Sequence, residues 1–150
     1  MKTYLAWSLA SGAFIPVMAI LNARLGRALG EPLHASVVLL CVGLVAALLS
    51  AAILTRSAPE LAGFGRARPA DYLGGLVVAF YVVSATLLAP RMGVGNFIVC
   101  AVSAQILSAM VIDHLGLFGA AVRPMNLLRG AGVVLLLAGI VMTQLGDPKS

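Results

Sequence analysis

The chain has 150 residues, of which 61% are hydrophobic and only 10% are charged, with a net charge of +5 and a mean hydropathy of +1.06. Soluble domains carry about 25% charged residues, and a soluble core of this size cannot hide so much apolar side chain. We therefore predict an all-α integral membrane protein. The arginines lie between apolar runs without interleaved aromatic residues, which argues against nucleic-acid binding. Neither a metal-ligand spacing nor a nucleophile motif occurs, so we expect no metal site, no cofactor and no enzyme.

Five apolar runs are long enough to cross a bilayer, since a spanning helix needs about 20 mostly apolar residues. The runs are continuous rather than alternating, which favours helices over strands. We expect a single five-helix transmembrane domain over residues 1–150, with spans at about 4–22, 33–54, 72–89, 94–113 and 127–145.

The first expected span combines polar residues with a proline. Ser11 and Asn22 fall near the helix face that also holds Ile15 and Met18. Both polar residues are candidates for lining a substrate cavity, although Asn22 could instead close the helix end. Pro16 removes one backbone hydrogen bond and should kink the helix, either as a hinge for transport or as a static packing feature.

Polar residues also interrupt the third and fourth spans, where lipid cannot satisfy them. Tyr81 lies about mid-span with Ser84 three residues further on, and its ring could stack on a substrate or pack in the core. Gln105 lies near the middle of the fourth span and shares a helix face with Ser108. These four residues are candidates for the same cavity. For Gln105 the alternative is a helix–helix hydrogen bond worth about 0.6–2 kcal/mol.

The fourth span ends at Asp113 and His114, and the fifth carries glycines seven residues apart. The Asp-His pair could couple transport to protons, because histidine titrates near neutrality, or it could be a solvated or salt-bridged helix end. Gly132 and Gly139 have the spacing of a close helix seam, which we interpret as a dimer interface. Packing within one subunit is the alternative.

Loop charges can be compared across the membrane because five spans place the termini on opposite sides. The positive-inside rule weakly favours a cytoplasmic N-terminus. The near-balance equally allows a chain that inserts both ways and pairs with an inverted copy. The N-terminal side carries six basic residues and the other side four: Lys2, Arg56, Arg66, Arg68, Arg123 and Arg129 against Arg24, Arg27, Arg91 and Lys149.

Three stretches of the chain together resemble one transporter family. They are "GAFIPVMAILNARLGRALGEPLHAS", "DYLGGLVVAFYVVSATLLAPRMGVGNFIVCAVSAQILSAMVIDHLGLFG" and "RGAGVVLLLAGIVMTQL". They resemble the YdcZ-type family of the drug/metabolite transporter superfamily, distant relatives of the small multidrug resistance transporters. Met18 stands where that family's signature leads us to expect glutamine, and Ala104 where we expect glycine. The first span has no carboxylate, so the proton exchange of the small multidrug exporters does not carry over.

The resemblance implies a multi-pass exporter of a small organic molecule in the bacterial inner membrane, built from two inverted five-helix halves. For this chain it implies an antiparallel, dual-topology homodimer that works by alternating access. The implied partners are the lipid bilayer, the inverted copy and a small-molecule substrate, for which a neutral or zwitterionic compound fits better than a cation. The alternatives are an obligate heterodimer with a sister five-helix chain, and a structural or assembly subunit that transports nothing.

Overall fold

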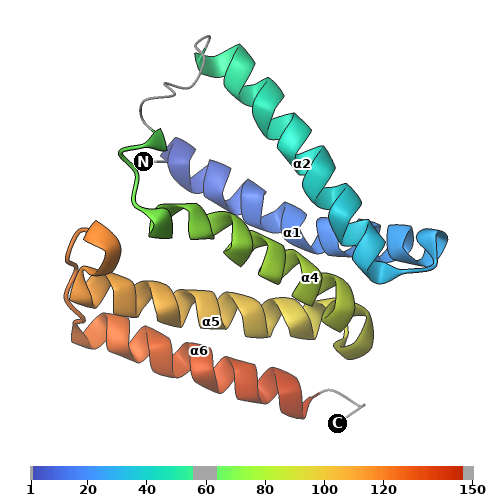
Figure 1. The fold of residues 1–150 in the computed structure, drawn as a ribbon. Helices are drawn as coiled ribbons and strands as arrows, with labels where there is room; N and C mark the ends of the chain where they lie inside the picture. Colours follow the sequence, from blue (N-terminus) through green and yellow to red (C-terminus); the bar gives the residue numbers. More distant parts are fainter. Residues whose placement is uncertain (1, 56–63, 147–150) are drawn as a thin grey trace. The chain divides into compact units, whose positions relative to one another are not determined.

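The structure is a computed structural model that describes residues 2–55 and 64–146 (Figure 1). Within these ranges, five helices are long and apolar enough to cross a membrane, and no residue lies in a strand, so the predicted all-helical membrane fold is confirmed. Arg56 and Lys149, which entered the charge comparison, lie outside the described residues. The elements are α1 (Lys2–Leu29), α2 (Pro32–Thr55), the 3-10 helix η1 (Pro69–Leu73), α4 (Gly74–Met92), α5 (Val94–Leu115), the 3-10 helix η2 (Leu117–Gly119) and α6 (Leu127–Leu145).

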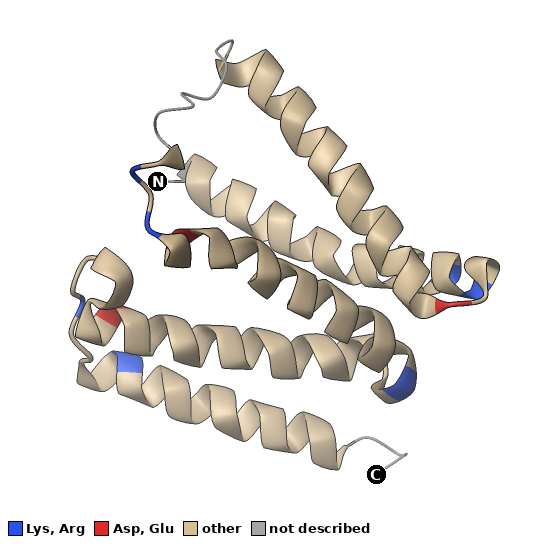
Figure 2. Cartoon of the chain, in the orientation of Figure 1, with Lys and Arg blue, Asp and Glu red and all other residues tan. Residues whose placement is uncertain are grey.

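The chain divides into two compact units, the first ending at Arg91 and the second beginning at Met92. The first unit holds α1, α2 and α4, and the second holds α5 and α6. Charged residues lie at helix ends and in connections, whereas the long middles of the helices are uncharged (Figure 2). Large apolar side chains such as Leu54, Phe80 and Leu127 are exposed along the helices, as a lipid-facing surface requires.

Helix α1 continues about two turns beyond the expected end of the first span. Arg24 and Arg27 do not end it, because arginine is a good helix former and both side chains are exposed. The helix ends instead at Gly30, whose φ of +73° is left-handed and favours glycine. Pro32 then starts α2, at the first helical position where proline is well tolerated.

Small residues let α1 and α2 approach each other closely at this turn. A Cβ atom on Gly26 would lie 3.1 Å from the Pro32 Cα, and Ala35 is fully buried. From the turn the two helices diverge (Figure 1). Helix α1 also runs through Pro16, which supplies no backbone N–H, so the Gly12 carbonyl lacks its usual helical donor. Whether Pro16 acts as a hinge stays a prediction.

Backbone and side-chain hydrogen bonds order the connection between α5 and α6. Helix α5 ends at Gly116, whose φ is +63° and whose N–H bonds to the Ile112 carbonyl. The Arg123 N–H donates to the Asp113 carbonyl at 2.8 Å, which turns the chain back toward α6. The Asn126 side chain then caps α6 by accepting from the Arg129 N–H at 2.8 Å.

Gly116→Ala should destabilise the protein, because the left-handed conformation alone costs about 1–2 kcal/mol for alanine. The added Cβ would also lie 2.7 Å from the Val122 Cγ2. Unfolding by SDS in mixed detergent micelles, followed by circular dichroism, measures the change. Gly95→Ala is the matched control within α5, since nothing lies within 4 Å of its Cβ position. Equal stability of the two variants would contradict the prediction.

Candidate functional site

A buried polar cluster joins the three spans of the first unit. Asn22 of α1, Ser36 of α2 and Thr86 of α4 are 6%, 2% and 3% exposed, respectively. Three nearly water-free polar side chains from three helices are costly in a membrane protein unless they bond one another. The hydrogen bonds among them show that they do.

The Thr86 hydroxyl is the hub of the cluster. It accepts a hydrogen bond from the Asn22 amide Nδ2 and a second, of 2.9 Å, from the Ser36 hydroxyl. Its own proton goes to the Val82 carbonyl one helical turn earlier, at 2.8 Å. The threonine therefore uses its single donor on α4 and can only accept from α1 and α2. This fixes the Asn22 side chain with its NH₂ group toward Thr86.

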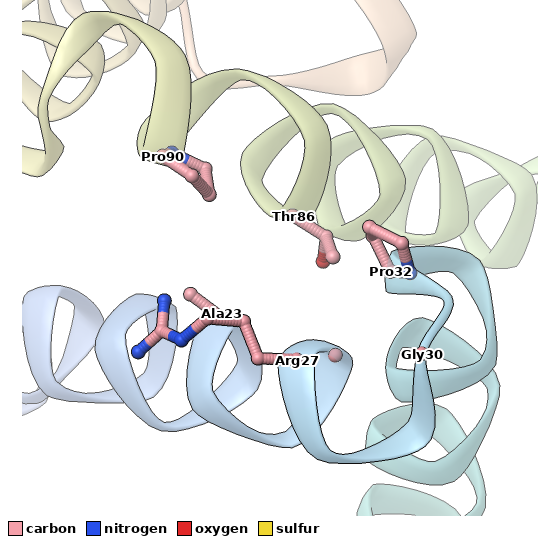
Figure 3. Close-up of a pocket in the computed structure, with 7 residues that line it drawn as sticks. Ala23, Arg27, Gly30, Pro32, Thr86 and Pro90 are labelled. Carbon is pink, nitrogen blue, oxygen red and sulfur yellow. The ribbon is translucent and has the colours of Figure 1, made fainter.

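A cavity of about 350 Å³ adjoins the cluster on the side of Thr86 and the α1–α2 turn. Its walls come from the end of α1, the turn at Gly30 and Pro32, and the face of α4 that bears Thr86 and Pro90. Figure 3 shows Thr86 pointing from α4 toward this turn, with Arg27 on the facing stretch of α1. The cavity thus combines one permanent positive charge with an otherwise mostly apolar wall.

A separate groove of about 420 Å³ runs between α1 and α2 on the Asn22 side of the cluster. Met18, Asn22 and Leu25 line it from α1 at helical spacing, and Leu39 lies opposite on α2. These residues are the less exposed part of the lining, whereas rim residues such as Phe14 are exposed. Asn22 is the only polar residue in the lining, which is drawn entirely from described parts of α1 and α2.

Only one residue of the expected cavity set, Asn22, lies in the polar cluster. Ser11 falls near the same face of α1, but three turns away, and its exposed hydroxyl donates to the Ser8 carbonyl at 2.8 Å. Tyr81 and Ser84 are half-buried on α4. Helical geometry turns them away from the face that carries Thr86.

The expected residues of the second unit are mostly on the surface of the single chain. Gln105 and Ser108 are exposed on α5, near its middle and one turn later. Gly132 and Gly139 are exposed on α6, and nothing lies within 4 Å of a Cβ added at either. The assignment of Gln105 and Ser108 to a substrate cavity stays a prediction. The assignment of Gly132 and Gly139 to a dimer seam also stays a prediction, and both glycines have room for a neighbouring helix.

Asp113 and His114 contact the connection between α5 and α6. The Asp113 Oδ2 lies 3.9 Å from the Arg129 Nη2, a half-exposed ion pair worth about 0–1 kcal/mol. The His114 Nδ1 accepts from the Met125 N–H at 3.1 Å, which requires that nitrogen to be unprotonated. These contacts favour the helix-end interpretation of the pair, and its role in proton coupling stays a prediction.

Sequence reasoning left Ser36 and Thr86 out of the expected site. Both are single small polar residues inside long apolar spans, where a hydroxyl usually bonds to its own helix. Ser50 of α2 does this, with its hydroxyl 2.7 Å from the Ala46 carbonyl. The signal that separates Ser36 and Thr86 from Ser50 is their burial, which depends on how the helices are rotated.

A family model described as "Putative inner membrane exporter, YdcZ" matches residues 3–142. The chain belongs to the YdcZ family. Together with five membrane-spanning helices in the described residues, this makes it a multi-pass inner-membrane protein. The family description names an exporter, which is a transporter rather than an enzyme. No curated protein and no solved structure shows significant similarity to the chain.

In this YdcZ-family chain, Thr86→Val should lower the free energy of unfolding by about 1–3 kcal/mol. Valine keeps the shape of threonine but removes the acceptor, so the Asn22 and Ser36 donors are left unpaired among the described helices. SDS unfolding of the purified protein measures the loss. Thr86→Ser keeps the hydroxyl and should restore most of the stability.

Ser50→Ala is the control for this comparison, because it removes an exposed hydroxyl that bonds only to its own helix. It should change stability by less than about 0.5 kcal/mol. A loss of stability in Ser50→Ala as large as that in Thr86→Val would show that the hydrogen bonds between helices contribute no more than a bond within one helix.

Proposed function

We propose that this chain is one half of a ten-helix exporter of small organic molecules, formed by two copies in opposite orientations. The observation that carries the proposal is the joint occurrence of a buried polar cluster with two adjoining hollows in a member of an exporter family. A transporter needs such a place, where polar groups are presented inside the bilayer without contact with lipid. The substrate binds there and reaches each side in turn by alternating access.

The proposal of a second copy is supported by polar groups that one chain leaves exposed. Gln105 lies near the middle of α5, and lipid offers no hydrogen bond to its amide. A covering partner or a water-filled cavity satisfies it. Gly132 and Gly139 give α6 a flat, open stripe against which another helix can pack closely. We therefore place α6 at the seam between the copies and Gln105 in the cavity that they enclose, with Ser108 beside it.

The opposite orientation of the copies is supported by the loop charges. Six basic residues on one side against four on the other give only a weak preference for one orientation. Two copies of a five-span chain form an inverted pair only if they insert in opposite directions. An obligate heterodimer with a sister chain is the nearest rival, and it requires this chain to insert in one direction.

Both orientations should be present in intact cells. A single cysteine at the exposed residue 67 (Ala67→Cys), in a background with Cys41→Ala and Cys100→Ala, is reacted with a membrane-impermeant thiol reagent. We expect partial labelling from outside and complete labelling after permeabilisation. The matched cysteine at the other set of loops, Met92→Cys, is exposed and leaves the loop charges unchanged, and it should give the complementary partial fraction. All-or-none labelling at both positions would exclude the inverted homodimer.

Gln105→Ala and Gly139→Leu should fail in different ways. Cells preloaded with N-phenyl-1-naphthylamine, an uncharged apolar dye with one N–H group, should lose it faster with the wild-type chain than without it. Gln105→Ala should abolish this difference while cross-linking still detects the dimer, since the amide lines the cavity. Gly139→Leu should remove the dimer and the efflux together, because the seam no longer closes.

Gly43→Leu is the matched control, because it adds the same side chain at an open helical position on α2 instead of α6. It should keep both the dimer and the efflux. Loss of the dimer in Gln105→Ala would instead favour a helix–helix hydrogen bond for that residue. If the wild type speeds efflux relative to cells without the chain and Gln105→Ala speeds it equally, Gln105 does not belong to the site. A dimer without efflux would support a structural subunit.

A further inference from the structure

The Asn22 side chain retains hydrogen-bonding capacity after the polar cluster is complete. The Thr86 hydroxyl donates to the Val82 carbonyl, so Asn22 can only donate to it, through its NH₂ group. Asn22 makes this single side-chain hydrogen bond among the described residues. Its amide oxygen, which can accept two hydrogen bonds, therefore has no donor from α1, α2 or α4.

This side chain is 94% buried, at 6% exposure, and it lines the groove between α1 and α2. The other lining side chains are apolar and none is charged, so none of them can donate to the amide oxygen. An amide oxygen that accepts no hydrogen bond from its own helices is unfavourable in an apolar surrounding. The groove therefore offers one hydrogen-bond acceptor to a molecule that carries a donor.

The chemistry of the groove restricts what that molecule can be. A lipid acyl chain fits the apolar walls but has no N–H or O–H group, so it leaves the oxygen unpaired. A charged group would lose its hydration without gaining an opposite charge, because the lining has none. The rim residues Phe14, Leu21 and Val38 are exposed, so the groove opens on the surface from which an apolar molecule would enter.

We propose that the groove binds the apolar body of an uncharged molecule that donates a hydrogen bond from an N–H or O–H group to the Asn22 Oδ1. This inference rests on the proposed exporter function and gives its substrate class. Asn22 serves as the specificity-determining residue, and Met18 and Leu25, one turn to either side, hold the apolar part. The Thr86 hub positions Asn22 by holding its NH₂ group.

Equilibrium binding of two matched radiolabelled probes to the purified protein in nanodiscs tests the inference. N-octylacetamide has an N–H donor, and N-methyl-N-octylacetamide has the same chain and carbonyl but no donor. The wild type should bind the first probe roughly five- to tenfold more tightly, the effect of one hydrogen bond in an apolar site. Asn22→Leu should bind the two probes equally, because it keeps the bulk of the side chain and removes the acceptor.

A second variant keeps the test decisive if Asn22→Leu does not fold. Val38→Trp fills the groove from its exposed rim without touching the polar cluster, and it should weaken binding of both probes at least fivefold. Leu48→Trp adds the same side chain on α2 outside the groove and should bind both probes as the wild type does.

Equal binding of the two probes by the wild type would overturn the inference, and so would a preference that survives Asn22→Leu. Undiminished binding by Val38→Trp would place the site elsewhere and overturn it as well. These measurements involve no transport. Efflux of N-phenyl-1-naphthylamine by a wild type that shows no donor preference would leave the exporter function standing and remove only the inference. A donor preference without efflux would support the groove as a binding site and contradict the exporter function.

Discussion

Lipid offers no hydrogen bonds, and the structure of the first unit follows from that constraint. Each polar group that enters the bilayer interior must find its partner within the protein. The Thr86 hydroxyl satisfies Asn22 and Ser36 together because its own proton is directed to the Val82 carbonyl. One oxygen atom thereby links three helices through hydrogen bonds. The small residues at the α1–α2 turn allow the approach that this arrangement needs.

The two units meet the same constraint in different ways. The first buries Asn22, Ser36 and Thr86 between its own helices, where they bond one another. The second keeps the Gln105 amide on the surface and presents open glycines on α6. Its internal hydrogen bonds are concentrated at the helix ends, around Asp113 and Asn126. The first unit thus satisfies its buried polar groups internally, whereas the second presents polar and small residues at its surface.

The spans could be predicted from sequence because the length of an apolar run is a local property. The end of α1 could not be placed from its charges, since Arg24 and Arg27 continue the helix and only the left-handed Gly30 ends it. Asn22 was recognised because an amide is rare in an apolar span. Its partners Ser36 and Thr86 were not, because hydroxyls in spans commonly bond to their own helix. Only the packing of three helices reveals which hydroxyls face one another.

Pro16 has a consequence for the lipid around α1. Because proline has no N–H, the Gly12 carbonyl must take its hydrogen bond from a group other than its helical partner, close to the centre of the apolar run. Space is open around Gly12, so a water molecule has room to approach. A water molecule bound to this carbonyl would carry hydration further into the bilayer than the apolar length of α1 indicates.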